Sequence, residues 1–319
     1  MIDILIPTFN RELFLIKNIL LLNEQAVKYD IFKNFRILVS NNNSTDDTKN
    51  VLLNVQKNIK IELILFEQTK NIGLEKNAIF LLEKSDAPFV MYLGDDDYLP
   101  DGYLSFILKK ISSDINLSTI IPGFSSLYGD GSITPARTAK FDVKKFPPSL
   151  KSALELSNFG HQLSGLVLKR DGLFERYVAN DELRNIYPFI FFVASNNLRG
   201  NSYYSPMHQV LVSQGNSKDW KYDESGLLTE ILKNYKIALP NSPIKRLLLG
   251  LAFTIQQSWR LQIGIRPNSI KKSILAYFHL CKNDSVDLAY KFILPFLYPY
   301  LYAKLIAVGV RNRLRRVMH

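Results

Sequence analysis

Cysteine and histidine are scarce in this chain of 319 residues, which contains one cysteine and four histidines. Cys281 alone excludes an intramolecular disulfide framework and a zinc site built from cysteines. The histidines are scattered, and none shows the spacing of a metal motif such as H-E-x-x-H. We expect Cys281 to be a small apolar residue that is buried or lies at an interface.

Two glycine-rich nucleotide-binding motifs are also absent. The sequence contains no P-loop of the form G-x-x-x-x-G-K-[ST], and no G-x-G-x-x-G follows a predicted strand. The turn after the first predicted strand, Pro7 to Asn10, contains no glycine at all. These absences exclude a P-loop nucleotide-binding protein and a dinucleotide-binding domain of the common type.

Four predicted strands alternate with predicted helices in the first 110 residues. The strands cover residues 2–7, 35–40, 60–66 and 89–93. This alternation predicts an α/β fold with a largely parallel, Rossmann-like mixed sheet that helices flank on both faces. Ligands of such sheets bind at the carboxyl ends of the strands, so we expect the four loops that follow these strands to form one site.

The loop after the fourth strand contains three adjacent carboxylates, Asp95, Asp96 and Asp97, directly after Gly94. Adjacent carboxylates repel one another unless a cation or hydrogen-bond donors share the site. Mg²⁺ and Mn²⁺ prefer oxygen ligands and commonly bridge one or two carboxylates to a substrate diphosphate. The cluster alone is equally compatible with a solvated acidic turn, and the three preceding loops favour the metal site.

Four sequence blocks together resemble a known enzyme family. In chain order they are IPTFNR, VSNNNSTDDT, NIGLEKNAI and FVMYLGDDDYLPDG. They look like the inverting glycosyltransferases of family 2, which have the GT-A fold and include enzymes that build bacterial surface polysaccharides. The resemblance covers residues 1–110 well and residues 160–215 weakly. It implies a nucleotide-sugar donor, a divalent metal cofactor (Mn²⁺ or Mg²⁺) and transfer of one sugar to a hydroxyl.

The family pattern also implies roles for individual residues. Asp95 and Asp97 match the metal-binding DxD pair, with Asp97 as the direct metal ligand and Asp95 nearer the ribose. The donor-binding residues implied by the pattern are Pro7, Thr8, Asn10, Arg11, Asn41, Gly73, Lys76, Asn77, Asp95 and Asp96.

Position 41 departs from the family pattern, which usually has there the aspartate that reads the base. A carboxylate only accepts hydrogen bonds and suits the N3–H of uracil or thymine. The Asn41 amide can accept or donate, depending on how it is flipped, and a donated bond would suit N3 of cytosine. The resemblance favours a UDP-sugar as donor, and dTDP- and CDP-sugars stay open.

The acidic residues that follow position 180 are candidates for the catalytic base. Asp181 and Glu182 stand about where the family often has the carboxylate that deprotonates the acceptor hydroxyl. The alternative is an ordinary acidic pair at a helix N-terminus. Asp219 is a further candidate for the base or for an acceptor contact. Beside it, Trp220 could stack on a sugar or pack in the core.

All of the excess positive charge lies in the last quarter of the chain. The net charge is +11, and residues 245–319 contain 13 lysines and arginines against two acids, whereas the remainder contains 27 of each sign. Long apolar runs occupy the same region. Basic residues beside apolar ones favour an interfacial helix on anionic lipid, and their leucine- and isoleucine-rich surroundings argue against a nucleic-acid surface.

The longest apolar run, residues 292–310, is close to the length of a membrane span, which needs about 20 apolar residues. Pro295, Pro299 and Lys304 interrupt it. Tyrosines at positions 298, 300 and 302 are typical of the membrane–water interface. Interfacial docking is therefore favoured, and the alternatives are a true span and a helical cap packed on the catalytic domain or on a partner subunit.

These features predict a two-part chain. Residues 1–240 are expected to form the GT-A catalytic domain, with a nucleotide-sugar half at 1–110 and an acceptor half at 111–240. Residues 241–319 are expected to form a basic, apolar helical extension that contacts a membrane surface. The first strand begins at Ile2 with no basic leader, so we expect no signal peptide and a location on the cytoplasmic side, peripheral on the inner face of the cell membrane.

The activity predicted from these features is metal-assisted, inverting sugar transfer to a lipid-linked oligosaccharide. One alternative is a sugar-phosphate nucleotidyltransferase, which the glycine-free turn after the first strand disfavours. The other is a non-catalytic scaffold of a glycan-assembly complex. The intact acidic cluster argues against a scaffold, because a silent copy has no need to retain adjacent carboxylates that repel one another.

Overall fold

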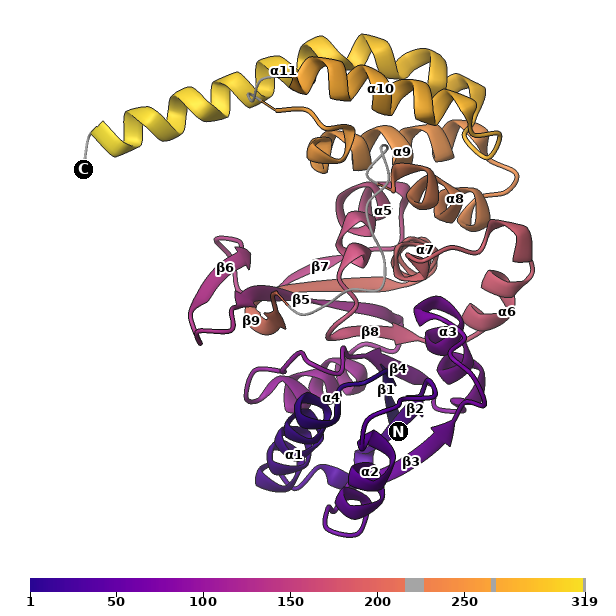
Figure 1. Ribbon diagram of the computed structural model, residues 1–319, viewed down its shortest axis with the longest axis vertical. Coiled ribbons are helices and arrows are strands. Elements are labelled where there is room, and N and C mark those ends of the chain that lie inside the picture. Colours follow the sequence, from indigo (N-terminus) through magenta and orange to yellow (C-terminus); the bar gives the residue numbers. More distant parts are fainter. Residues whose placement is uncertain (216–226, 265–267, 318–319) are drawn as a thin grey trace.

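The computed structural model describes residues 1–215, 227–264 and 268–317, with side chains through residue 307. A mixed sheet runs through the centre of the described chain, and its first four strands alternate with helices as the sequence predicts (Figure 1). These strands are parallel, in the order β3-β2-β1-β4. Their bounds are Ile2–Thr8 for β1, Phe35–Asn41 for β2, Glu62–Glu67 for β3 and Phe89–Tyr92 for β4.

The acceptor half adds the other strands of the same sheet. β8 is antiparallel to both β4 and β5, and β9 continues the sheet parallel to β5. The short strands β6 and β7 pair with β5 and β9. Their bounds are Leu117–Leu127 for β5, Ile133–Arg137 for β6, Lys144–Phe146 for β7, Leu166–Lys169 for β8 and Asn201–Ser213 for β9.

Strands β1, β2 and β4 are buried on both faces, and their successive side chains point to opposite sides of the sheet. In β1, Ile4 and Ile6 belong to one apolar core, whereas Leu5 belongs to another on the opposite face. The first core packs against α1 (Glu12–Lys28), α2 (Thr48–Gln56) and α4 (Tyr103–Ser113). The second packs against α3 (Leu74–Lys84), α6 (Leu173–Val178) and α7 (Pro188–Asn197).

A third core joins the catalytic part to the C-terminal helices. It contains residues of α5 (Leu150–Leu156), α7 and α8 (Leu228–Ala238) together with residues of the last three helices, which are α9 (Pro243–Gln256), α10 (Ser269–Lys282) and α11 (Leu288–Val317). All residues of α7 are buried, because this helix lies between the sheet and the C-terminal helices (Figure 1). A boundary at residue 240 therefore falls between α8 and α9, inside one continuous apolar core.

The GT-A-like arrangement predicted from the sequence is confirmed, with the C-terminal helices packed at the end opposite the nucleotide half (Figure 1). Cys281 is half-buried in α10 and its thiol is free. β5 and β6 are antiparallel neighbours and form a hairpin.

Candidate active site

The carboxyl ends of the parallel strands bring the predicted donor residues together. Thr8, Asn41 and Glu67 are paired with one another across β1, β2 and β3, at the last position of each strand. The loop after β4 joins them, because the Thr8 hydroxyl donates a hydrogen bond of 2.8 Å to Asp95 Oδ2. Pro7 and Thr8 are buried at the end of β1. This edge of the sheet is the candidate active site.

Asp95 lies at this edge in an environment that disfavours its negative charge. Burial and the adjacent charge of Asp96 raise the pKa of Asp95 to about 7. The hydrogen bond from Thr8 and the positive charge of Arg11 act in the opposite direction but are outweighed. Arg11 therefore lies near enough to the cluster to interact with it electrostatically.

Asp97 is more deeply buried than Asp95, with 5% of its surface exposed. Its Oδ1 accepts a hydrogen bond of 2.9 Å from the backbone N–H of Ser213. Its Oδ2 accepts from the Gln162 amide at 3.2 Å and from the Ser164 hydroxyl. Burial and the charge of Asp96 nevertheless raise the pKa of Asp97 to about 7. Three donors leave the carboxylate with about one of its four acceptor positions for another partner.

Gly94 makes room for this arrangement. A Cβ at this position would lie 2.8 Å from Asp97 Oδ2 and 3.1 Å from Ser164 Oγ. The amide of Asn18 on α1 donates a 2.8 Å hydrogen bond to the Gly94 carbonyl and fixes the turn from the other side. A side chain at position 94 would therefore displace the carboxylate of Asp97.

The donor set of this cluster fits a divalent cation. Two carboxyls with pKa values of about 7 lie within one three-residue turn, and a bound cation would favour their ionised forms. Within the residues described, no three acidic, histidine or cysteine side chains converge on a ready-made metal cage. Mg²⁺ and Mn²⁺ are commonly held by one or two carboxylates together with substrate phosphates, which is the type of site that these residues match.

The loop after β1 is bound to the loop after β2. Asn10 has a positive φ of 54°, a left-handed conformation that asparagine tolerates better than most residues. Its backbone N–H donates to Ser44 Oγ at 2.9 Å, and its Oδ1 accepts from the Thr45 N–H at 2.8 Å. Asn10 thus bridges two loops of the donor site through contacts within the protein.

The loop after β3 contains the other predicted donor residues. Gly73 has a φ of 82°, and its N–H donates to the side chain of Asn71. Lys76 is exposed in the first turn of α3. Asn77 is buried, and its amide exchanges hydrogen bonds of 2.6 and 2.9 Å with Ser40. Asn77 therefore supports the loop from beneath, whereas Lys76 faces solvent.

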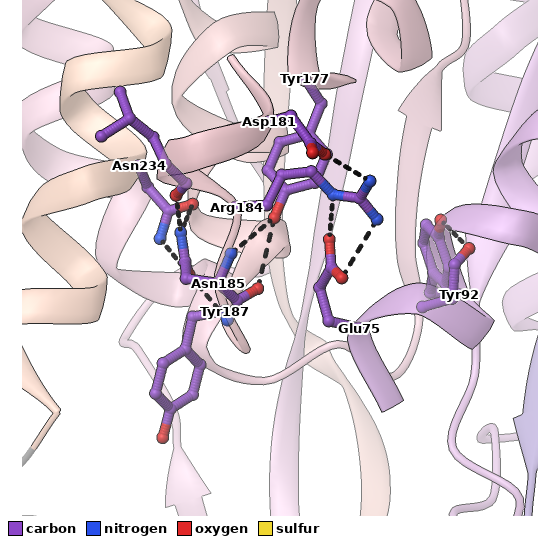
Figure 2. Close-up of polar contacts among 10 residues, drawn as sticks. Glu75, Tyr92, Tyr177, Asp181, Arg184, Asn185, Tyr187 and Asn234 are labelled. Atoms are coloured by element: carbon purple, nitrogen blue, oxygen red, sulfur yellow. Dashed lines mark hydrogen bonds and ion pairs between the residues drawn. The ribbon is translucent and has the colours of Figure 1, made fainter. Parts of the chain in front are cut away.

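The candidate base Asp181 lies on a short turn, η3 (Asp181–Leu183), and forms an ion pair with Arg184 (Figure 2). The Arg184 guanidinium donates to Asp181 at 2.9 Å and to both carboxylate oxygens of Glu75, on α3, at 2.8 and 3.2 Å. The Asp181 side chain is 82% exposed, and Glu182 is also exposed. Arg184 therefore connects the turn of the candidate base to the first turn of α3.

The turn that carries Asp181 is braced from below by buried amides. The Asn185 and Asn234 side chains exchange hydrogen bonds of 3.1 and 3.2 Å (Figure 2). The Asn185 backbone N–H donates to the Tyr177 hydroxyl at 3.2 Å. Asp219 and Trp220, the second candidate region, lie outside the described residues.

Several residues of the site carry no signal in the sequence. Ser164 and Ser213 contact Asp97 across 67 and 116 residues of chain, and each is one serine among many. Glu67 and Arg184 were not predicted either, because their partners are side chains of other elements. Only the three-dimensional pairing of strands and loops identifies them.

The exposed side of α10 and α11, which we call the C-terminal outer face, is apolar. Its exposed apolar residues are Ile270, Ile274, Leu275 and Phe278 of α10 and Leu288, Phe292, Phe296, Tyr300 and Ile306 of α11, and most of them recur every four positions along their helix. An open apolar pocket of about 540 Å³ lies on this face, lined by Tyr277, Leu288, Ala289, Lys291, Phe292 and Ile293. Lysines 271, 272 and 282 of α10 are also exposed.

Two of the three tyrosines predicted for a membrane interface contact protein instead. The hydroxyl of Tyr298 donates to the backbone carbonyl of Ser273 at 2.9 Å, and the Tyr302 hydroxyl lies 2.9 Å from the Ser273 hydroxyl. Tyr300 is 53% exposed on the outer face. Among the described residues, no helix has the length and apolar character that crossing a membrane requires.

Known proteins resemble this chain in sequence and in fold. The chain is 32% identical over 179 residues to the GalNAc(5)-diNAcBac-PP-undecaprenol beta-1,3-glucosyltransferase of Campylobacter jejuni, and the match covers 51% of this chain and 56% of that relative. It therefore spans little more than half of the relative's length. The structure of S. aureus TarS 1–349 in complex with UDP-GlcNAc matches 96% of this chain and 88% of that one, with a TM-score of 0.64 and 16% identity.

A second solved structure has the same fold, the mannosyltransferase PcManGT from Pyrobaculum calidifontis in complex with GDP-Man and Mn²⁺. It matches 98% of this chain and 86% of that one, with a TM-score of 0.55 and 15% identity. The sequence model of the family described as "Glycosyl transferase family 2" matches residues 3–165, which include all four predicted blocks and half of the chain. The chain therefore belongs to glycosyl transferase family 2 and is a glycosyltransferase.

Proposed function

We propose that this enzyme transfers a sugar from a UDP-sugar to a hydroxyl of a lipid-linked glycan, with inversion at the anomeric carbon. The observation that carries the proposal is the pair of buried carboxyls at the end of β4, Asp95 and Asp97, whose pKa values of about 7 favour a cationic partner. The Campylobacter relative, named for an undecaprenol-linked substrate, supports the acceptor class. TarS with UDP-GlcNAc and PcManGT with Mn²⁺ support the donor and the metal.

The donor would lie along the carboxyl ends of β1 to β4. Asp97 and Asp95 would hold Mn²⁺ or Mg²⁺, which when bound supplies positive charge that stabilises the leaving diphosphate. Thr8 orients Asp95 through its 2.8 Å hydrogen bond, and Arg11 adds positive charge beside it. Lys76, exposed at the N-terminal turn of α3, is placed to add a second positive charge at the same edge.

Inversion requires one direct displacement, and therefore a base for the acceptor and a stabilised leaving group. We assign the base to Asp181, because Arg184 holds its carboxylate at 2.9 Å, whereas Glu182 is the alternative on the same turn. Asp181 takes the proton from the acceptor hydroxyl while the hydroxyl oxygen bonds to the anomeric carbon. The bond between that carbon and the diphosphate oxygen breaks, and UDP leaves with the bonding electrons.

The enzyme would meet its acceptor at the inner face of the cell membrane through the C-terminal outer face. This face combines exposed aromatic side chains such as Phe292 and Phe296, each 75% exposed, with neighbouring lysines. Aromatic side chains insert into the interfacial region, and each lysine near an anionic bilayer contributes about 1 kcal/mol, which salt screens.

The experiment that tests the function is a thermal-shift panel of UDP-, dTDP-, CDP- and GDP-sugars with and without Mn²⁺, followed by transfer to a polyprenyl-diphosphate-linked glycan. A bound ligand raises the melting temperature by mass action. We expect a metal-dependent increase with a UDP-sugar and transfer from that donor. No increase with any nucleotide sugar would contradict the proposal.

The base is tested by two separate substitutions, Asp181→Asn and Glu182→Gln. The variant that lacks the base should bind the donor normally and transfer about 100-fold more slowly or worse, since a general base contributes roughly 10² to 10⁴ in rate. We expect this loss in Asp181→Asn. If both variants keep full transfer, the base lies elsewhere, and Asp219→Asn is the next substitution to measure.

The membrane contact is tested by co-sedimentation with anionic liposomes. We expect the full chain to sediment and high salt to release only part of it, because salt screens the lysines but not the apolar contact. The double substitution Phe292→Ser/Phe296→Ser should release most of the protein. The matched control is Ile115→Ser, since Ile115 is 90% exposed and lies before β5 in the catalytic part. Unchanged sedimentation of the double variant would place the membrane contact elsewhere.

A further inference from the structure

The amide of Asn41 is fixed in one orientation by two neighbours of opposite hydrogen-bonding character. Its Oδ1 accepts a hydrogen bond of 3.1 Å from the backbone N–H of Ser44. Its Nδ2 donates to the carboxylate of Glu67, at 3.1 Å from Oε2 and 3.3 Å from Oε1. In a flipped amide, the Asn41 NH₂ group would face the Ser44 N–H, and the Asn41 oxygen would face the Glu67 carboxylate. Only the observed orientation satisfies both neighbours.

Glu67 brings a negative charge to the place where the donor base is proposed to lie. It is the last residue of β3 and is paired with Asn41 in the parallel register of β2 and β3. Its side chain is exposed, and among the described residues it forms no salt bridge. A carboxylate has about four acceptor positions, and one amide nitrogen leaves most of them available to a ligand.

We propose that Glu67 reads the donor base and selects pyrimidines that have a ring N–H. This inference rests on the proposed function, in which a nucleotide lies at the carboxyl edge of β1 to β4. The Glu67 carboxylate can accept the N3–H of uracil or thymine. The N3 of cytosine is itself an acceptor, so it would meet the carboxylate with a lone pair against a negative charge. Glu67 thus favours UDP- and dTDP-sugars over CDP-sugars.

The same contact gives a physical reason for asparagine at position 41. An aspartate there would place a second carboxylate about 3 Å from Glu67, and two like charges so close cannot both ionise without a large cost. Asn41 instead donates to Glu67 and holds it in position. Glu67 on β3 thereby supplies the hydrogen-bond acceptor for the nucleotide base, and Asn41 acts as a positioning residue.

The test measures the dissociation constants of UDP and CDP, in the presence of Mn²⁺, for the full chain and four variants. The unmodified enzyme should bind UDP about tenfold more tightly than CDP or better, because the N3–H of uracil donates to the Glu67 carboxylate, whereas the N3 lone pair of cytosine would face it. Glu67→Gln should reduce this ratio to about twofold or less, because a glutamine amide can either accept or donate. Glu62→Gln, at the exposed start of the same strand, is the matched control and should keep the ratio.

Two further variants separate base reading from a merely structural role. Asn41→Asp should weaken UDP binding, because it pairs two carboxylates. The combined Asn41→Asp/Glu67→Gln exchanges the two groups and should restore the preference for UDP. Two results would overturn this inference and leave the proposed function intact. One is a UDP/CDP ratio that Glu67→Gln leaves unchanged, and the other is equal binding of UDP and CDP by the unmodified enzyme. Binding of neither nucleotide would overturn the proposed function and this inference with it.

Discussion

Asp97 and Asp114 are both buried carboxylates, and their surroundings shift their pKa values in opposite directions. Asp97, beside Asp96, has a pKa raised to about 7 by burial and by that neighbouring charge. Burial also disfavours the charge of Asp114, but hydrogen bonds from Lys145, Asn201 and Tyr203 outweigh it and lower the pKa to about 2. The charge of Asp114 is satisfied by the protein itself, whereas that of Asp97 is not.

The difference separates a structural acid from a functional one. Asp114 ends α4 and joins it to β9 and β7 through its partners on those strands, at distances of 2.8 to 3.0 Å. Asp97 gains three donors as well, yet it shares its turn with two further carboxylates. The protein's own hydrogen bonds do not offset the cost of ionising this cluster, and a bound cation can offset it.

The largest expected effect follows from removing the charge of Asp97. Asp97→Asn should abolish Mn²⁺-dependent nucleotide binding and reduce transfer roughly 100-fold or more, the range seen when one group that stabilises developing charge is lost. The protein should still fold, because asparagine keeps the shape of the side chain. Transfer assays and thermal unfolding measure both effects.

The matched control for that substitution is Asp101→Asn. Asp101 lies in the same loop, and its contacts are an exposed ion pair with Lys28 at 2.5 Å and an exposed hydrogen bond from the Tyr29 hydroxyl at 3.0 Å; exposed pairs of this kind contribute little. This control should keep both nucleotide binding and transfer. Full transfer by the Asp97 variant would mean that Asp97 does not bind the metal and that its role is structural, like that of Asp114.

The next effect concerns pH. The folded-state pKa values of Asp95 and Asp97 are raised from the ordinary 3.8 to about 7, so protons compete with a metal below pH 7. Affinity for Mn²⁺ should therefore fall about tenfold or more between pH 8 and pH 6. Without metal, the same two groups should destabilise the fold progressively as pH rises from about 4 to about 7, since the unfolded chain releases these protons first.

Thermal unfolding at pH 6, 7 and 8, with and without Mn²⁺, measures this dependence. The increase in melting temperature caused by Mn²⁺ should be largest at pH 8. In Asp97→Asn, the increase should be small at all three values. An increase that is equal at pH 6 and pH 8 would mean that the two carboxyls do not compete with protons for the metal.

The smallest effect belongs to Asp114. Because its folded-state pKa is lowered to about 2, its charge stabilises the fold above pH 4, and that contribution is lost as pH falls from about 4 to about 2. Asp114→Asn should lower the free energy of unfolding at pH 7 by about 1 kcal/mol, allowing for screening by solvent. Denaturant unfolding at pH 7 and pH 2.5 measures the loss, which should fall to about a third at the lower pH. A variant that lost Mn²⁺ binding would contradict the structural role.

The first half of the fold and the acidic cluster were predictable from the sequence. Strands buried on both faces appear as continuous apolar runs, and β1, β2 and β4 are of this kind, whereas β3 at the sheet edge is only partly buried. The rule that loops meet at the carboxyl edge of a parallel sheet then placed Thr8 near Asp95, and their hydrogen bond confirms it. Residues that lie at strand ends are predictable because their position follows from the sheet alone.

Residues whose role depends on a distant partner were not predictable. The flip of Asn41 is decided by Glu67, 26 residues away, and that pairing exists only once β2 and β3 are in register. The tyrosines of α11 are equivalent in sequence, and only the packing of α10 decides that Tyr298 and Tyr302 face Ser273 while Tyr300 faces outward. Helical spacing shows that a face exists but not which neighbour covers it.

The most direct test of the metal site is calorimetric titration of Mn²⁺ into the UDP-saturated enzyme at pH 7, in PIPES and in Tris. These buffers differ in their heats of protonation, so the difference in observed heat counts the protons released. Because the pKa values of Asp95 and Asp97 are about 7, Mn²⁺ binding should release protons, and the heats should differ between the buffers. No binding, or binding with the same heat in both buffers, would contradict the assignment of these carboxyls as the metal site.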